Sequence, residues 1–148
     1  MEADSIEQTN NWTYEETVDE MDGTKSKFAS TGSTNTLQFA FPYDGGSTGD
    51  LVVRKTGKKL DVYLKISKGQ FISSYTWDRT VDIKFDDGKT LQYAYGSSSD
   101  YSSDVIFLDN AAQLLSKLKA AKQVKIKIDF YQYSGQVLTF NTEGLNFK

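Results

Sequence analysis

A strict alternation of apolar and polar residues, directly after a helix-like segment, is the feature of this sequence that most limits its fold. From Val124 to Tyr131 the two kinds of residue alternate without a break, which is typical of a β-strand with one buried and one wet face. From Asn110 to Ala121, apolar residues recur three and four positions apart and predict a short helix. Its apolar stripe consists of Ala111, Leu114, Leu115, Leu118 and Ala121.

Local chemistry predicts the ends of this helix and the hairpin that follows. Asn110 stands at the N-cap position, and Gln113 is placed three residues later to bond back to it. Lysines gather toward the other end, where cations interact favourably with the helix dipole. After the strand, residues 134–136 (Ser-Gly-Gln) predict a turn and residues 137–140 its returning strand.

The rest of the chain has the pattern of short strands separated by turns. We predict strands at residues 12–18, 25–30, 37–41, 51–54, 60–66, 81–85, 91–95 and 105–108, besides those at 124–131 and 137–140. The expected fold is mainly β, or α+β by strict count. It is an antiparallel two-layer β-sandwich or partly open barrel of about nine strands, with the one helix near Asn110 to Ala121 closing an edge or end.

The start of the chain differs from the rest in charge. Of 20 acidic residues, eight lie between Met1 and Asp22, which has no Lys or Arg, so the remainder carries 12 acidic against all 17 basic residues. We expect residues 1–10 to be a flexible acidic tail and residues 11–148 to be a single β-sandwich domain. The opening is no signal peptide, but it is typical of what remains when a secretion or lipoprotein leader has been removed.

Composition removes most catalytic and metal-binding chemistry. The chain has no Cys and no His, so it has no thiol nucleophile, imidazole base or Cys/His zinc site. We expect no metal, no cofactor and no catalytic residues. Hydrolysis by paired carboxylates remains as an alternative, for which the candidates are Glu15 with Glu16, Asp82 with Asp86, and Asp109.

Five lysines near the helix and the alternating strand form a candidate basic surface: Lys117, Lys119, Lys122, Lys125 and Lys127. Such a surface would suit phosphate or an acidic partner, or it is simply the wet side of a helix end and a strand. The sequence pI of about 5.0 argues against nucleic acid, because nucleic-acid-binding domains are usually clearly basic. No apolar run approaches the roughly 18 residues of a membrane span.

Aromatic residues give the better functional signal. They make up 14% of the chain, and several fall in loops or on the outward phase of a strand. These are the candidate ligand-binding residues Tyr75, Trp77, Tyr101, Tyr131 and Tyr133, which together would form a platform for sugar rings or a protein partner. The alternative is that β-rich domains use tyrosine on half-buried faces.

Several short motifs follow one another at spacings that resemble a known family. They are Trp12-Thr13-Tyr14, the segment from Phe39 to Gly46, Asp61 to Leu64, Gly69-Gln70-Phe71, Val81 to Gly88, and the ending from Phe130 through Phe140 to Gly144-Leu145. In these the chain resembles a family of small exported bacterial β-sandwich proteins, often lipoproteins of unassigned role. That family is distantly like the periplasmic accessory proteins of type VI secretion.

The resemblance implies a role without chemistry. It suggests a non-enzymatic exported module, periplasmic or cell-surface, that binds an unknown protein or glycan partner in the envelope or has a structural task there, with a possible lipid anchor upstream. A carbohydrate-binding module is the alternative. Many members of the family carry two cysteines, which the resemblance implies are bridged. Here Ser73 and, approximately, Arg79 stand in their places.

Overall fold

The structure is a computed structural model that describes residues 11–100 and 102–147. The predicted tail, residues 1–10, lies outside the described residues. The strands are β1 (Thr13–Val18), β2 (Lys25–Gly32), β3 (Gly49–Thr56), β4 (Lys59–Ile66), β5 (Arg79–Phe85), β6 (Thr90–Ser97), β7 (Val105–Leu108), β8 (Gln123–Phe130) and β9 (Tyr133–Asn141), and the helix is α2 (Ala111–Ala120).

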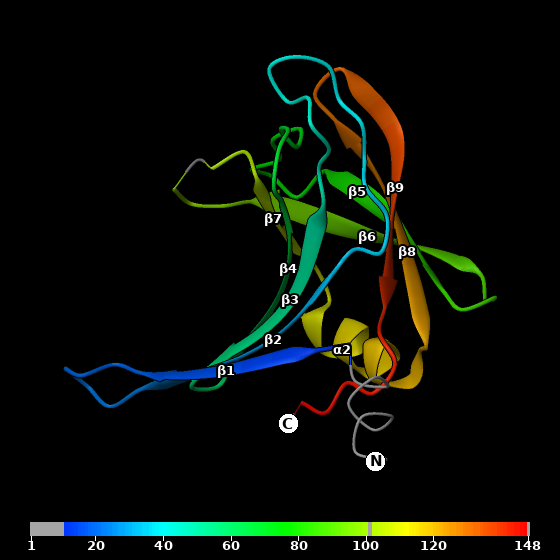
Figure 1. Ribbon diagram of the computed structural model, residues 1–148. Coiled ribbons are helices and arrows are strands. Elements are labelled where there is room, and N and C mark those ends of the chain that lie inside the picture. The colour runs from blue at the N-terminus through cyan, green and yellow to red at the C-terminus, as the bar shows by residue number, and fades with distance from the viewer. Residues whose placement is uncertain (1–10, 101, 148) are drawn as a thin grey trace, which may run out of the picture.

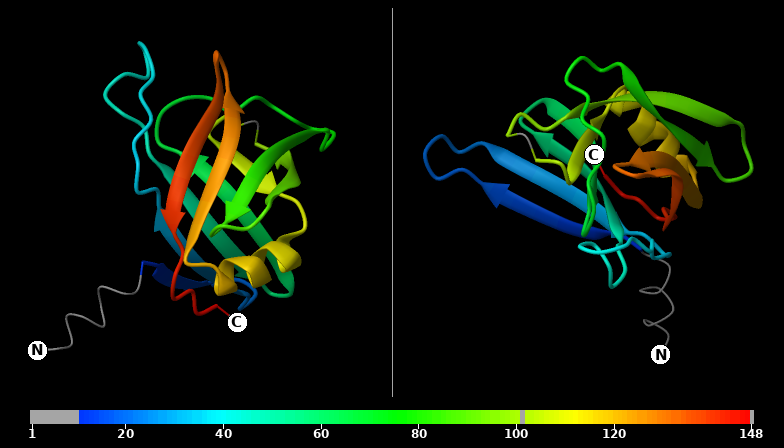
Figure 2. Two further views of the ribbon diagram at one scale, coloured as in Figure 1. Left: turned by 90° about the vertical axis from the view of Figure 1, so that its right-hand side faces the viewer. Right: turned by 90° about the horizontal axis from the view of Figure 1, so that it is seen from above.

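All nine strands belong to one antiparallel sheet, in the order β1-β2-β3-β4-β7-β6-β5-β8-β9. The prediction of a mainly β fold with a single short helix is confirmed for the described residues, and the sheet stays open rather than closing into a barrel. Figure 1 shows that the sheet bends back on itself, so that β2, β3 and β4 face β8 and β9 across the core while α2 covers one end. Figure 2 shows the same two layers from the side and from above.

The alternation of apolar and polar residues from Val124 to Tyr131 sets the phase of β8. Val124, Ile126, Ile128 and Phe130 are buried, with at most 2% of their surface exposed, while the residues between them face solvent. Burial of such side chains is worth about 1.5–3 kcal/mol each. The opposite layer supplies the other half of the core through residues such as Val53, Val62 and Leu64.

Helix α2 buries the predicted stripe, but its N-terminus is built differently from the prediction. Leu114 and Leu118 are each 1% exposed, which confirms the inward face. Asn110 stands at the N-cap position as predicted, but its backbone is left-handed with φ of 57° and its side chain makes no capping hydrogen bond, so the predicted capping interaction is wrong. Gln113 is also engaged elsewhere, since its Oε1 accepts a 3.0 Å hydrogen bond from the Tyr93 hydroxyl. The helix is therefore tied to β6 rather than capped locally.

The segment predicted as a strand at residues 37–41 is an extended loop instead. Leu37 makes one isolated bridge to Ser47, and Phe39 is buried with its ring 5.3 Å from that of Phe130. Phe41 is 87% exposed and is followed by a cis bond to Pro42. Leu37 and Phe39 are buried and Phe41 is not, and the two buried residues cover the end of the core without joining a ladder.

The last hairpin reverses earlier than the sequence predicts. The turn lies at Tyr131 and Gln132, where Gln132 has φ of 69°, and residues 134–136 already belong to β9. A register shift lies between Ile128 and Phe130. The Asp129 carboxylate accepts the Gly135 main-chain N–H at 2.7 Å, so the predicted turn glycine is held inside the hairpin.

One edge of the sheet is covered by a neighbouring loop. Asn35 donates from Nδ2 to the Val137 carbonyl and accepts at Oδ1 from the Thr139 N–H, each at 2.9 Å. The amide side chain thereby replaces a strand neighbour for β9. Next to it, Ser33 bridges Phe140. This edge is satisfied, whereas the opposite edge of the sheet is β1.

Candidate binding face

The Trp77 indole rests directly on the backbone of Gly96 in β6. A Cβ built on Gly96 would lie 2.5 Å from Trp77 Cε2, which no real side chain tolerates. The ring therefore packs directly on Gly96, which has no side chain to block it. Trp77 remains 47% exposed, so one side of the indole is open to solvent.

Strand register places further aromatic residues beside this contact. Gly96 pairs with Phe107 of β7, and Phe107 pairs with Tyr63 of β4. Directly paired residues project to the same face of a sheet, so the three rings lie in a row across β6, β7 and β4. The Tyr63 and Phe107 ring centroids are 5.3 Å apart. The row spans two strand spacings, about 10 Å.

An ion pair adjoins the row. Arg54 of β3 donates from Nη2 to Asp61 Oδ2 at 2.7 Å, and its guanidinium carbon lies 5.4 Å from the Tyr63 ring centroid and 5.6 Å from that of Phe107. Cations over aromatic rings at this distance are attracted by the ring quadrupole. Arg54 Nε is buried without a hydrogen-bond partner, so Asp61 is the partner that holds the charge in place.

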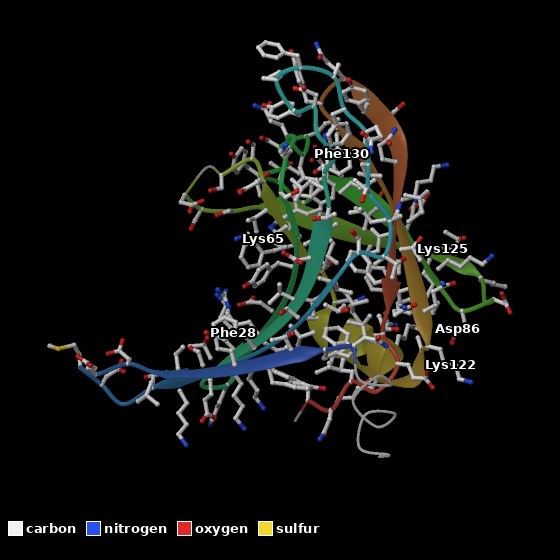
Figure 3. All side chains as sticks on the ribbon, viewed as in Figure 1. Phe28, Lys65, Asp86, Lys122, Lys125 and Phe130 are labelled. Atoms are coloured by element: carbon white, nitrogen blue, oxygen red, sulfur yellow. The ribbon has the colours of Figure 1, made fainter. Side chains whose placement is uncertain are left out.

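Phe28 of β2 completes the surface, because it pairs in register with Arg54. We call this set the outer aromatic face: Phe28, Arg54, Asp61, Tyr63, Phe107 and Trp77. Figure 3 shows Phe28 and Lys65 pointing away from the core, on the side between the projecting β1–β2 hairpin and the loop after β6. Burial raises the pKa of the Tyr63 phenol, an effect that Arg54 partly offsets. The hydroxyl therefore stays neutral and both donates and accepts hydrogen bonds.

The loop that carries Trp77 is fixed at its base. Ser74 Oγ donates to Asp78 Oδ1 at 3.0 Å, and the Ser74 N–H donates to Ser97 Oγ at 2.7 Å. The hydrogen bonds from Ser74 and Thr76 lower the pKa of the Asp78 carboxyl. Ser73 and Arg79, the positions of the cysteines implied by the resemblance, flank this contact.

The predicted ligand-binding residues fall into two groups with different neighbours. Tyr75, 53% exposed, shares its loop with Trp77. Tyr131 is 59% exposed at the β8–β9 turn, where its N–H bonds to the Gln70 carbonyl. Tyr133 is half-buried, with its ring 4.8 Å from that of Phe39 and its hydroxyl accepting the Ala40 N–H. Tyr101 lies outside the described residues, and a platform of all five stays a prediction.

Sequence reasoning found Trp77 but not the residues that lie beside it. Tyr63 stands between Asp61 and Lys65 on the outward phase of a strand, and that alternation was the available signal. Phe107 lies in a four-residue apolar strand, where no alternation distinguishes outward from inward. The contribution of Gly96 depends on long-range contact and left no trace in the local pattern.

The five lysines of the candidate basic surface lie on α2, just after it and along β8, and that they form one surface stays a prediction. Lys117 is half-buried with its Nζ 5.8 Å from the Phe85 ring centroid, while Lys125 and Lys127 are exposed on β8. Asp86 Oδ1 accepts the main-chain N–H groups of Lys122 and Gln123, both at 3.0 Å. In Figure 3, Lys122, Lys125 and Asp86 lie across the molecule from Phe28, so this region is separate from the outer aromatic face.

The carboxyl groups with a displaced pKa belong to turns. Hydrogen bonds within their own loops lower the pKa of Asp22 and Asp100, as they do for Asp78. Within residues 11–100 and 102–147, no three acidic side chains gather as a metal site would require. Nor is any helix in that part of the chain long and apolar enough to cross a membrane.

Comparison with known proteins identified no relative of this chain. No protein-family model, no curated protein and no solved structure matches the chain.

Proposed function

We propose that the protein is a non-enzymatic binding module that holds carbohydrate on its outer aromatic face. The observation that carries the proposal is the row formed by Trp77 on Gly96, Phe107 and Tyr63. A half-exposed indole that packs on a glycine outside the core contributes little to the stability of the fold. It offers a flat apolar surface in a fixed orientation, beside two more rings.

The chemistry of the face fits a sugar chain. One side of a pyranose ring is a patch of C–H groups, which packs on an aromatic ring, and the row of about 10 Å is comparable to a disaccharide. Hydroxyl groups at the edge of the sugar need donors and acceptors. Arg54, Asp61 and the Tyr63 hydroxyl supply both kinds next to the rings. Rigid aromatic rings with a few oriented polar groups are typical of ligand sites.

A protein partner in the envelope is the second candidate. Trp, Tyr and Arg are the residues that most often dominate the binding energy of protein interfaces, and all three occur on this face. Both candidates would use the same surface. The identity of the bound ligand therefore distinguishes them, and substitutions on the face do not.

We also propose that the protein catalyses no reaction. A general acid needs a carboxyl group whose pKa is raised, and the displaced carboxyl groups, Asp22, Asp78 and Asp100, are lowered by turn hydrogen bonds. We further propose an exported location, periplasmic or cell-surface, in bacteria. This rests on the family resemblance of the sequence alone, and glycans are abundant in that compartment.

Binding is tested first on a glycan array and then by calorimetry with the oligosaccharide that is retained best. Trp77→Ala should weaken binding about two- to tenfold, since an aromatic contact is worth about 0.5–1.5 kcal/mol. Tyr131→Ala, at a more exposed aromatic residue on the β8–β9 turn, is the control and should bind like the parent. Retention that Trp77→Ala leaves unchanged would place the site elsewhere. If no glycan is retained, the protein partner becomes the leading candidate.

A further inference from the structure

The edge strand β1 has no neighbour on its outer side among the described residues. It pairs with β2 alone, and all six of its residues are exposed. Figures 1 and 2 show the β1–β2 hairpin projecting from the body with β1 outermost. An unpaired edge offers a row of free N–H and C=O groups to which another extended chain can bond.

The register identifies which main-chain groups are free. The Asp19 N–H donates to the Thr24 carbonyl at 2.8 Å, so this pair at the end of the hairpin is hydrogen-bonded. Hydrogen-bonded and non-bonded pairs alternate along an antiparallel ladder. On the far side of β2, the Lys25 carbonyl accepts from Gly57 at 3.2 Å, which agrees with that alternation. The residues whose N–H and C=O point away from β2 are therefore Tyr14, Glu16 and Val18.

Charge selects the kind of chain that fits. Glu15 and Glu16 lie at the centre of β1, and the chain up to Asp22 has eight acidic residues and no basic one. A second copy pairing antiparallel along the full strand would bring Glu16 opposite Glu16, and like charges directly opposite are destabilising. A basic strand would instead place Lys or Arg opposite both glutamates.

A groove beside β1 has room for the side chain of a Lys or Arg from the added strand. It has a volume of about 410 Å³ and lies between the β1–β2 hairpin and the C-terminal segment, with Tyr14, Glu16, Lys27 and Phe147 in its lining. The Tyr14 hydroxyl accepts the Asn146 N–H at 3.0 Å, which fixes that ring against the C-terminal segment. Aromatic walls suit the aliphatic stem of Lys or Arg. The lining has two glutamates, Glu15 and Glu16, against one lysine, Lys27, so a basic side chain meets an excess of negative charge there.

We infer that β1 binds an extended basic segment of a partner protein as an added antiparallel strand. Basic residues of that segment lie opposite Glu15 and Glu16, and apolar residues lie opposite Tyr14 and Val18. The groove shares Phe28 with the outer aromatic face, but the free edge of β1 is a separate surface, and the inference does not depend on the proposed glycan function.

The probe is a capped synthetic peptide, Thr-Val-Thr-Lys-Lys-Val-Thr, with a matched peptide in which Glu replaces both Lys. Amide hydrogen exchange is measured on the labelled protein. With the Lys peptide at about ten times its Kd, exchange at Tyr14, Glu16 and Val18 should slow about tenfold, while the Glu peptide has no effect. No protection at these three amides, or equal protection by both peptides, would overturn the inference.

Two variants separate main-chain pairing from charge. Val18→Pro removes an N–H that β2 does not use and keeps both glutamates, so it should abolish binding and leave β1–β2 paired; circular dichroism verifies the fold. Glu15→Lys/Glu16→Lys should bind the Glu peptide and reject the Lys peptide. Trp77→Ala is expected to bind the Lys peptide like the parent. If the double Lys variant keeps the preference of the parent, charge does not select the partner and the inference is wrong.

Discussion

The Trp77 indole lies against Gly96 so closely that a Cβ there would approach Cε2 to 2.5 Å. Gly96→Ala should therefore displace the ring from β6. We expect iodide to quench Trp77 more strongly and glycan affinity to fall about as much as in Trp77→Ala. Gly32→Ala is the matched control, because its Cβ would have its nearest contact at an ordinary 3.5 Å. Unchanged quenching in Gly96→Ala would mean that the close contact with Gly96 does not position the Trp77 ring.

Acid should release the loop that carries Trp77. Hydrogen bonds from Ser74 and Thr76 lower the pKa of Asp78 in the folded protein. A carboxyl group whose pKa falls on folding contributes stability above its unfolded pKa, about 3.9, and that contribution is lost as pH falls through the lower folded value. Iodide quenching of Trp77 should be flat from pH 7 to 5 and rise only below about pH 4.

Asp78→Asn supplies the control for that titration, because it removes the titrating group. Its quenching should already be raised at neutral pH and should lack the acid step. An acid step that persists in Asp78→Asn would assign the transition to another carboxyl group.

The Arg54–Asp61 pair should matter more than an ordinary surface ion pair. The side chains are 30% and 15% exposed, and Arg54 Nε already lacks a partner. Asp61→Ala leaves the guanidinium without its acceptor, so the free energy of unfolding should fall by about 1–3 kcal/mol. Asp50→Ala, an exposed residue on β3, should change it by less than about 0.5 kcal/mol. Equal losses in urea melts would contradict the assigned role of Asp61.

The phase of β8 is tested by two neighbouring residues. Ile128 is 2% exposed, so Ile128→Ala should cost about 2–5 kcal/mol, whereas Lys127→Ala should cost under about 0.5 kcal/mol. Urea melts of both variants measure the difference. Similar costs for the two substitutions are incompatible with the described burial.

Periodic elements of the fold were predictable because one physical signal dominates them. Alternation in β8 and the stripe on α2 report which face is buried, and the structure places both faces as predicted. The strand expected at residues 37–41 was wrong because alternation reports burial and not pairing: Phe39 is inward-facing yet packs on Phe130 without a ladder.

Predictions from short-range turn and cap signals were weaker. Asn110 had the right residue type for a cap, but its left-handed backbone excludes the geometry that a cap needs. Gly135 suggested a turn, yet the Asp129 carboxylate holds it within β9. Long-range contacts decide such positions. The same reason explains the site: Trp77 was recognisable as a loop aromatic residue, whereas its position beside Phe107 depends on how β6 and β7 pair.

The most direct measurement of the central proposal is an NMR titration with the glycan that binds best, following the Trp77 indole N–H and the ring protons of Phe107, Tyr63 and Tyr131. Binding on the outer aromatic face predicts that the Trp77, Phe107 and Tyr63 signals shift together along one saturating curve while Tyr131 stays still. Shifts confined to Tyr131 and its turn, with the Trp77 indole unmoved at saturation, would contradict the account.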